Sequence, residues 1–126
     1  MIIVNFSHPL NAPQLAEAEK LAQEPVERVV ELRTQFADSE PFAQQVQHLL
    51  AGCDVSPREW QTRTVLVVLP SHNVIAATLL AELDGRTGYL PSVLRLRPTA
   101  DTALARFEVQ EIVPLQQIRD RARTRR

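Results

Sequence analysis

Short apolar runs alternate with amphipathic segments along this chain, and no other feature of the sequence restricts its fold as strongly. The apolar runs predict strands at residues 1–6, 26–36, 64–69, 93–97 and 106–113. Between the first four runs, apolar residues recur at the spacing of helices that bury one face. Strands that alternate with helices form a mostly parallel sheet with helices on both faces. The sequence therefore predicts an α/β, Rossmann-like three-layer domain.

Start and stop signals delimit the predicted helices. An Asn or Ser followed three residues later by Gln or Glu forms a capping box, proline opens or ends a helix, and glycine often closes one. The signals are Asn11, Gln14 and Pro25 for the first helix, Ser39, Pro41 and Gly52 for the second, and Ser56 with Glu59 for a short turn that carries Trp60. A third helix is predicted over residues 74–83, and residues 85–91 are predicted as a loop with an exposed Tyr89. We expect Trp60 to anchor the core rather than to stack on a ligand.

The carboxyl-terminal part departs from this alternation. The connection between the fourth and fifth predicted strands is too short for a crossover helix, so we expect the fifth strand to run antiparallel to the fourth. Pro114 fits the first position of a last helix. Residues 119–126 carry five arginines against one aspartate, and we expect a frayed basic tail there. The sequence thus predicts one domain over residues 1–118 and a tail over residues 119–126.

Composition excludes several classes of protein. No apolar run approaches the roughly 18 residues that a bilayer span needs, and the amino terminus does not read as a secretory signal, so we expect a cytoplasmic protein. One cysteine and three histidines do not favour a metal site. The three glycines cannot form a dinucleotide fingerprint or a phosphate loop, and we expect no cofactor. A formal net charge of -1 argues against general nucleic-acid binding.

Polar residues follow two of the predicted parallel strands. Ser7 and His8 come after the first strand, and Ser71, His72 and Asn73 come after the third. Ligands of open parallel sheets bind beyond the carboxyl ends of the strands, where helix N-termini offer amide groups and a positive dipole end. Serine hydroxyls can hold a phosphate there, and histidine can donate to it or move a proton near neutral pH. The repeated Ser-His pair predicts a site for an anionic, nucleotide-like ligand.

These residues also have ordinary structural explanations. Ser71 could cap its helix, and both histidines could bond loop carbonyls. A hydrolase triad is a weaker alternative, because Ser71 lacks the flanking glycines of a nucleophile elbow.

Two arginines on the fourth predicted strand extend the candidate site. Arg95 and Arg97 leave the same face of that strand and could clamp phosphates. The alternative is a row of surface ion pairs with Glu108 or Glu111 on the neighbouring strand. We include both arginines in the predicted ligand site, with Arg97 as the stronger candidate.

Three segments carry a resemblance to a known family. They are the opening MIIVNFSHPL, the central EWQ followed by LPSHN, and the later GYLPSVLRLRP. Together they resemble a small family of ancillary proteins of type III CRISPR systems, related to the CRISPR-associated Rossmann-fold (CARF) sensors and grouped with the ring nucleases. The resemblance runs from Met1 to about Ile118.

The resemblance implies a ligand and, in some relatives, a reaction. The ligand is a cyclic oligoadenylate such as cyclic tetra-adenylate, and ring opening in such proteins needs no metal because a ribose 2'-hydroxyl attacks the adjacent phosphorus. His8 and His72 are the candidates for proton transfer if this protein is an enzyme. The only lysine, Lys20, is not near either histidine in the sequence. We therefore expect the protein to hold the messenger and to open it slowly or not at all.

Two alternatives stay open at this stage. One is a metal-independent ring nuclease, and the other is a protein-interaction module without a nucleotide. A symmetric ring is best covered by more than one small domain, so we also expect a homodimer or a larger assembly promoted by the ligand.

Overall fold

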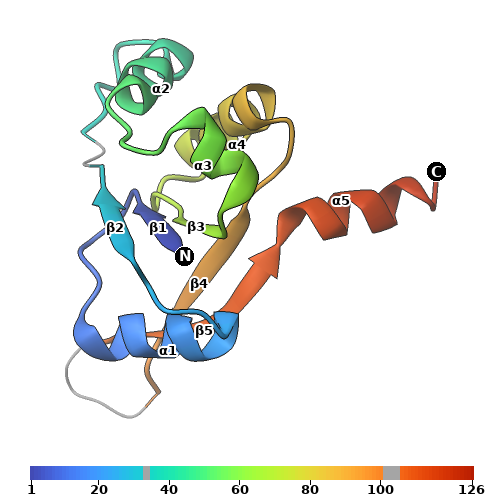
Figure 1. Cartoon of the computed structure of the whole chain (residues 1–126). Helices are drawn as coiled ribbons and strands as arrows, with labels where there is room; N and C mark the ends of the chain where they lie inside the picture. Colours follow the sequence, from blue (N-terminus) through green and yellow to red (C-terminus); the bar gives the residue numbers. More distant parts are fainter. Residues whose placement is uncertain (33–34, 101–105) are drawn as a thin grey trace.

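The computed structural model describes residues 1–32, 35–100 and 106–126, and its core is a five-stranded sheet (Figure 1). The strands are β1 (Ile2–Asn5), β2 (Arg28–Glu31), β3 (Val65–Val68), β4 (Ser92–Pro98) and β5 (Phe107–Pro114). Their order is β2-β1-β3-β4-β5, with β1 to β4 parallel and β5 antiparallel to β4. The predicted α/β, Rossmann-like fold with an antiparallel last strand is confirmed.

Helices cover both faces of the sheet. Helices α1 (Ala12–Ala22), α2 (Phe42–Ala51), α3 (Pro57–Thr62) and α4 (Asn73–Thr87) do so, and a last helix, α5 (Leu115–Arg123), follows β5. The step from β1 to β2 crosses the sheet in one direction, and the steps through α2, α3 and α4 cross it in the other. Right-handed crossovers therefore place α1 on one face and α2 to α4 on the opposite face, as Figure 1 shows.

The two central strands are buried on both faces. Every residue of β1 and β3 is buried. Alternate side chains enter two apolar clusters, so that Ile2 and Val67 pack with α2 to α4 while Ile3 and Leu66 pack with α1. This explains why both runs are apolar throughout, instead of alternating with polar residues as a half-exposed strand does.

In the described part of the predicted segment 26–36, the second strand is shorter than predicted, and residues 33–34 lie outside the described residues. It runs from Arg28 to Glu31, and its last ladder partner is Asn5 at the end of β1. Because β2 is an edge strand with β1 as its neighbour, its ladder ends where β1 ends. A β-rich sequence cannot extend a strand beyond the partner that bonds it.

Helix α4 is longer than the helix predicted over residues 74–83. The prediction of a loop over residues 85–91 is therefore wrong for residues 85–87. Residues 85–87 belong to α4, and Gly88 closes the helix with a left-handed φ of 85°. Tyr89 is half-buried and donates a hydrogen bond from its hydroxyl to the carbonyl of Trp60. Trp60 is buried, as predicted. Packing of α4 against the core therefore outweighs the low helix propensity of Gly85.

The last helix is also more regular than the predicted frayed tail. Pro114 is its N-cap rather than its first residue, and the helix continues through Arg123 without a break at residue 118. No residue of α5 is buried, and α5 projects away from the sheet and the other helices (Figure 1). In the part of the chain that the structure describes, no helix is long and apolar enough to span a membrane.

Acid should weaken the contact between β2 and α3 through Glu59. Its carboxylate accepts from the Ser56 amide at 3.1 Å and from the Arg28 guanidinium at 2.8 Å. The Ser56 amide, and then Arg28, lower the pKa of Glu59 below 4.5. A lowered pKa stabilises the fold above the unfolded-state pKa, and that contribution is lost as the pH falls through the folded-state value.

We therefore expect Glu59→Gln to lower the free energy of unfolding at pH 7, and we expect the difference from wild type to shrink below about pH 4.5. Urea unfolding at pH 7 and at pH 3 measures it, with the exposed Glu40→Gln as the matched control. An equal loss of stability at both pH values would contradict the assignment.

Candidate ligand-binding site

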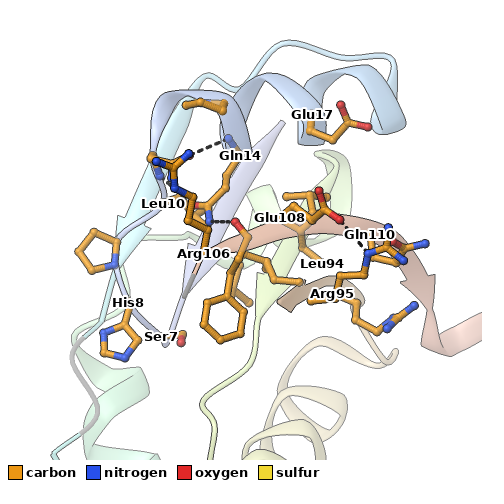
Figure 2. A pocket seen from close by; sticks show the side chains of 18 of the residues that line it. Ser7, His8, Leu10, Gln14, Glu17, Leu94, Arg95, Arg106, Glu108 and Gln110 are labelled. Atoms are coloured by element: carbon orange, nitrogen blue, oxygen red, sulfur yellow. Dashed lines mark hydrogen bonds and ion pairs between the residues drawn. The ribbon is translucent and has the colours of Figure 1, made fainter. Parts of the chain in front are cut away.

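A groove of about 1270 Å³ lies at the carboxyl end of the parallel strands. One wall is the segment that joins β1 to α1, together with the start of α1. The other wall is formed by the carboxyl end of β4 and the amino end of β5, which lie side by side because the two strands are antiparallel. Figure 2 shows this arrangement, with Ser7 and His8 on one side and Arg95 and Gln110 on the other.

Unequal strand lengths create the groove. β3 pairs with β4 through Leu66–Ser92 and Val67–Val93, and β3 ends at Val68. β4 continues to Pro98 with β5 as its partner. The two strands therefore extend past the ends of β1 and β3 as a two-stranded arm. The space between this arm and the β1–α1 loop is left open to solvent.

The Asn5 side chain holds the β1–α1 loop by two hydrogen bonds. It is only 1% exposed, and it is the buried polar residue of the described core. Its side-chain oxygen accepts from the Ser7 amide at 2.9 Å, and its side-chain amide donates to the His8 carbonyl at 2.8 Å. The Ser7 and His8 side chains are exposed and line the groove. The sequence analysis missed Asn5, although a polar residue ending an apolar strand was a usable signal.

The two Ser-His segments follow neighbouring strands, as the sequence analysis expected. β1 and β3 are adjacent and parallel with Asn5 opposite Val68, and the Phe6 amide donates to the Val68 carbonyl at 2.9 Å. Ser71 lines the groove together with Ser7 and His8. These three predicted residues are therefore brought to one site.

His72 and Asn73 are not among the described residues that line the groove. His72 is the N-cap of α4, and its Nδ1 accepts from the Ile75 amide at 3.4 Å. Its ring packs edge-to-face on Phe42 of α2, with 5.3 Å between ring centroids. The alternative in which Ser71 caps this helix is wrong, because the cap is His72. Asn73 is exposed at the first position of α4.

The predicted arginines line the groove in ion pairs. Arg95 Nε lies 2.8 Å from the Glu111 carboxylate, and Arg97 Nε lies 2.9 Å from that of Glu108. This is the row of ion pairs that the sequence analysis weighed as the alternative to phosphate binding. Exposed pairs of this kind contribute little to stability, and a competing anion can replace one partner. Both residues stay candidates for ligand contact.

Arg106 is a cation of the groove that the sequence analysis missed. It precedes β5, is exposed and lines the groove (Figure 2). Within residues 1–32, 35–100 and 106–126, no acidic side chain forms an ion pair with it. Its guanidinium is therefore better available to an anion than those of Arg95 and Arg97.

The chemistry that this groove can perform follows from its side chains. Ser7, Ser71 and Arg106 can donate hydrogen bonds to an anionic ligand, and His8 can donate or move a proton. Among the described residues, no group of three or more histidine, cysteine or acidic side chains could hold a metal ion. The Cys53 thiol lies elsewhere, in a hollow between α2, α3 and α4, and burial raises its pKa. The groove therefore offers hydroxyl, imidazole and guanidinium groups to an anionic ligand.

The fold and the groove define a class: an α/β protein with a groove beyond the carboxyl ends of parallel strands, the position where ligands of such sheets bind. Comparisons with protein-family models, with curated proteins and with solved structures give no match for this chain.

We expect Asn5→Ala to destabilise the protein by about 1–3 kcal/mol, the usual cost of leaving buried polar groups without partners. The substitution removes both hydrogen bonds that hold the Ser7–His8 loop. Urea unfolding measures the change, and Asn73→Ala, which alters an exposed asparagine, is the matched control. A variant as stable as wild type would show that Asn5 does not hold this loop.

Proposed function

We propose that this protein binds a cyclic oligoadenylate of type III CRISPR antiviral signalling, cyclic tetra-adenylate in the first place, and dampens the signal by sequestration. The observation that carries the proposal is the convergence of Ser7, His8, Ser71 and Arg106 on one groove. The identity of the ligand comes from the sequence resemblance to ancillary CRISPR proteins related to CARF sensors. The cytoplasmic location expected from the sequence belongs to the same proposal.

The chemistry of the ligand fits the groove. Cyclic tetra-adenylate carries four phosphates and exposed adenine bases on one ring. Hydroxyl, imidazole and guanidinium groups are the usual protein donors to phosphate oxygens. Pockets for drug-sized ligands measure about 300–1,000 Å³, so a groove of about 1270 Å³ suits part of a ring larger than a mononucleotide.

The openness of the groove also supports the proposed assembly. A ring held against one side by one copy would leave its other side in solvent, where a second copy could bind by the same residues. We therefore propose a homodimer or a larger assembly that the ligand promotes. Each ring would bridge two grooves, so the subunits would associate more tightly when the ligand is present.

Ring opening is the alternative activity, and the groove favours it less. In that reaction a ribose 2'-oxygen bonds to the adjacent phosphorus, the 5'-oxygen leaves, and the proton moves from the 2'-hydroxyl to the leaving oxygen. His8 lines the groove and could move the proton, whereas His72 would have to leave its cap on α4. Lys20 is not among the described lining residues. Positioning of the ring would have to supply most of the acceleration.

A protein-interaction module is the second alternative, and α5 is the observation that favours it. This helix projects from the body with no buried residue, and its Ile118 is 48% exposed. Five arginines lie within residues 119–126. A partner that uses α5 would leave the groove without a role, so the effect of groove substitutions separates the two functions.

The affinity for cyclic tetra-adenylate should fall by about 1–3 kcal/mol in His8→Ala, which removes a hydrogen-bond donor to a charged group. Isothermal titration calorimetry measures the loss. His48→Ala is the matched control, because His48 is exposed on α2 and is absent from the described groove lining. Equal affinity in both variants would reject the groove as the binding site.

Sequestration and ring opening differ in their products. With protein in excess over radiolabelled cyclic tetra-adenylate, we expect the ring to stay intact over many minutes and the particle mass to rise on addition of ligand. Chromatography of the label and mass photometry of the same sample measure the two. Rapid conversion to linear products, continuing over many turnovers when the ring is instead in excess over the protein, would establish the ring nuclease, and an unchanged mass would reject bridging by the ligand.

A further inference from the structure

We propose that Phe107 is an aromatic platform that stacks against one adenine base of the bound ring. This inference rests on the proposed function and adds the recognition of the base to that of the phosphates. Phe107 is 55% exposed, the largest exposed fraction among the large apolar side chains of the described residues, and it lines the groove.

The strand register explains how this ring comes to be in the groove. Leu96 pairs with Val109 and Pro98 pairs with Phe107 across β4 and β5. Leu96 and Val109 pack in the cluster on the α1 side of the sheet. Because residues two apart in a strand share a face, Phe107 continues that apolar row on the α1 side. Helix α1 reaches the Phe107 backbone through Gln14, but the Phe107 side chain stays 55% exposed.

Two hydrogen bonds hold the backbone that presents the ring. The Gln14 side-chain amide donates to the Phe107 carbonyl at 2.9 Å, and the Thr99 amide donates to the Arg106 carbonyl at 2.9 Å. Gln14 is itself fixed by the capping box that starts α1. The ring is thus offered from a positioned strand end, which lowers the entropy lost when a ligand stacks on it.

The neighbours of Phe107 favour a nucleotide over a protein surface. The groove lining combines polar residues such as Arg106 and Gln14 with apolar residues such as Leu10 and Leu96, and Phe107 lines it beside both kinds. A planar base with a polar rim matches that pattern, because its face stacks on the phenyl ring and its edge stays among polar groups. Arg106 lines the same groove, where its guanidinium could meet a phosphate of the ring.

Affinity for cyclic tetra-adenylate in four proteins tests the proposal: wild type, Phe107→Ala, Phe107→Leu and Phe107→Trp. We expect both Phe107→Ala and Phe107→Leu to bind roughly tenfold more weakly, since each lacks the π-face that stacking uses, and Phe107→Trp to bind at least as tightly as wild type. Ile118→Ala is the matched control, because it shortens an apolar side chain of similar exposure outside the described groove lining. We expect it to bind like wild type.

A fluorescence measurement adds a readout that a merely structural role would not change. The indole introduced at position 107 should lose emission when cyclic tetra-adenylate binds, whereas wild type, whose Trp60 is buried on the opposite face of the sheet, should not. Wild-type affinity in Phe107→Ala, or in Phe107→Leu, would overturn the stacking proposal and leave the proposed function intact. A wild-type protein without affinity for the ring would reject both.

Discussion

The pairing of β1 with β3 at the centre of the sheet is the interaction on which the rest of this structure depends. Both strands are buried at every residue, and each fully buried valine, leucine or isoleucine contributes about 1.5–3 kcal/mol by leaving water. Since the strands are parallel and in register, their carboxyl ends lie side by side. The segments that follow β1 and β3, which contain Ser7 and Ser71, therefore lie together at the carboxyl-terminal edge of the sheet.

The groove depends on a second constraint, which is the mismatch between the short central strands and the longer β4–β5 pair. β3 ends at Val68, while β4 continues to Pro98 because β5 bonds it along its whole length. The arm brings Arg106 and Phe107 opposite the β1–α1 loop. A cation, an exposed ring and the Ser7–His8 loop then face one space, although about 100 residues separate them in the sequence.

Charge within the groove is largely compensated. Arg95 and Arg97 are each paired with a glutamate on β5, which leaves Arg106 as the arginine of the lining without an acidic partner among the described residues. A ligand that approaches this site meets one available cation and several neutral donors. That balance suits a ligand recognised through hydrogen bonds better than one recognised by charge alone.

The sequence by itself determined the alternation of strands and helices, the capping boxes at Asn11 and Ser56 and the antiparallel last strand, because these depend on local spacing. It also predicted that Ser7, His8 and Ser71 would share a strand-end site. Tertiary structure alone decided that His72 would cap α4 and pack on Phe42, and that Asn5 would fix the loop. It also decided where β2 stops and that Phe107 stays exposed in the groove. These outcomes depend on where a partner strand ends and on how far a helix covers the sheet. Neither can be read from the spacing of residues along the sequence.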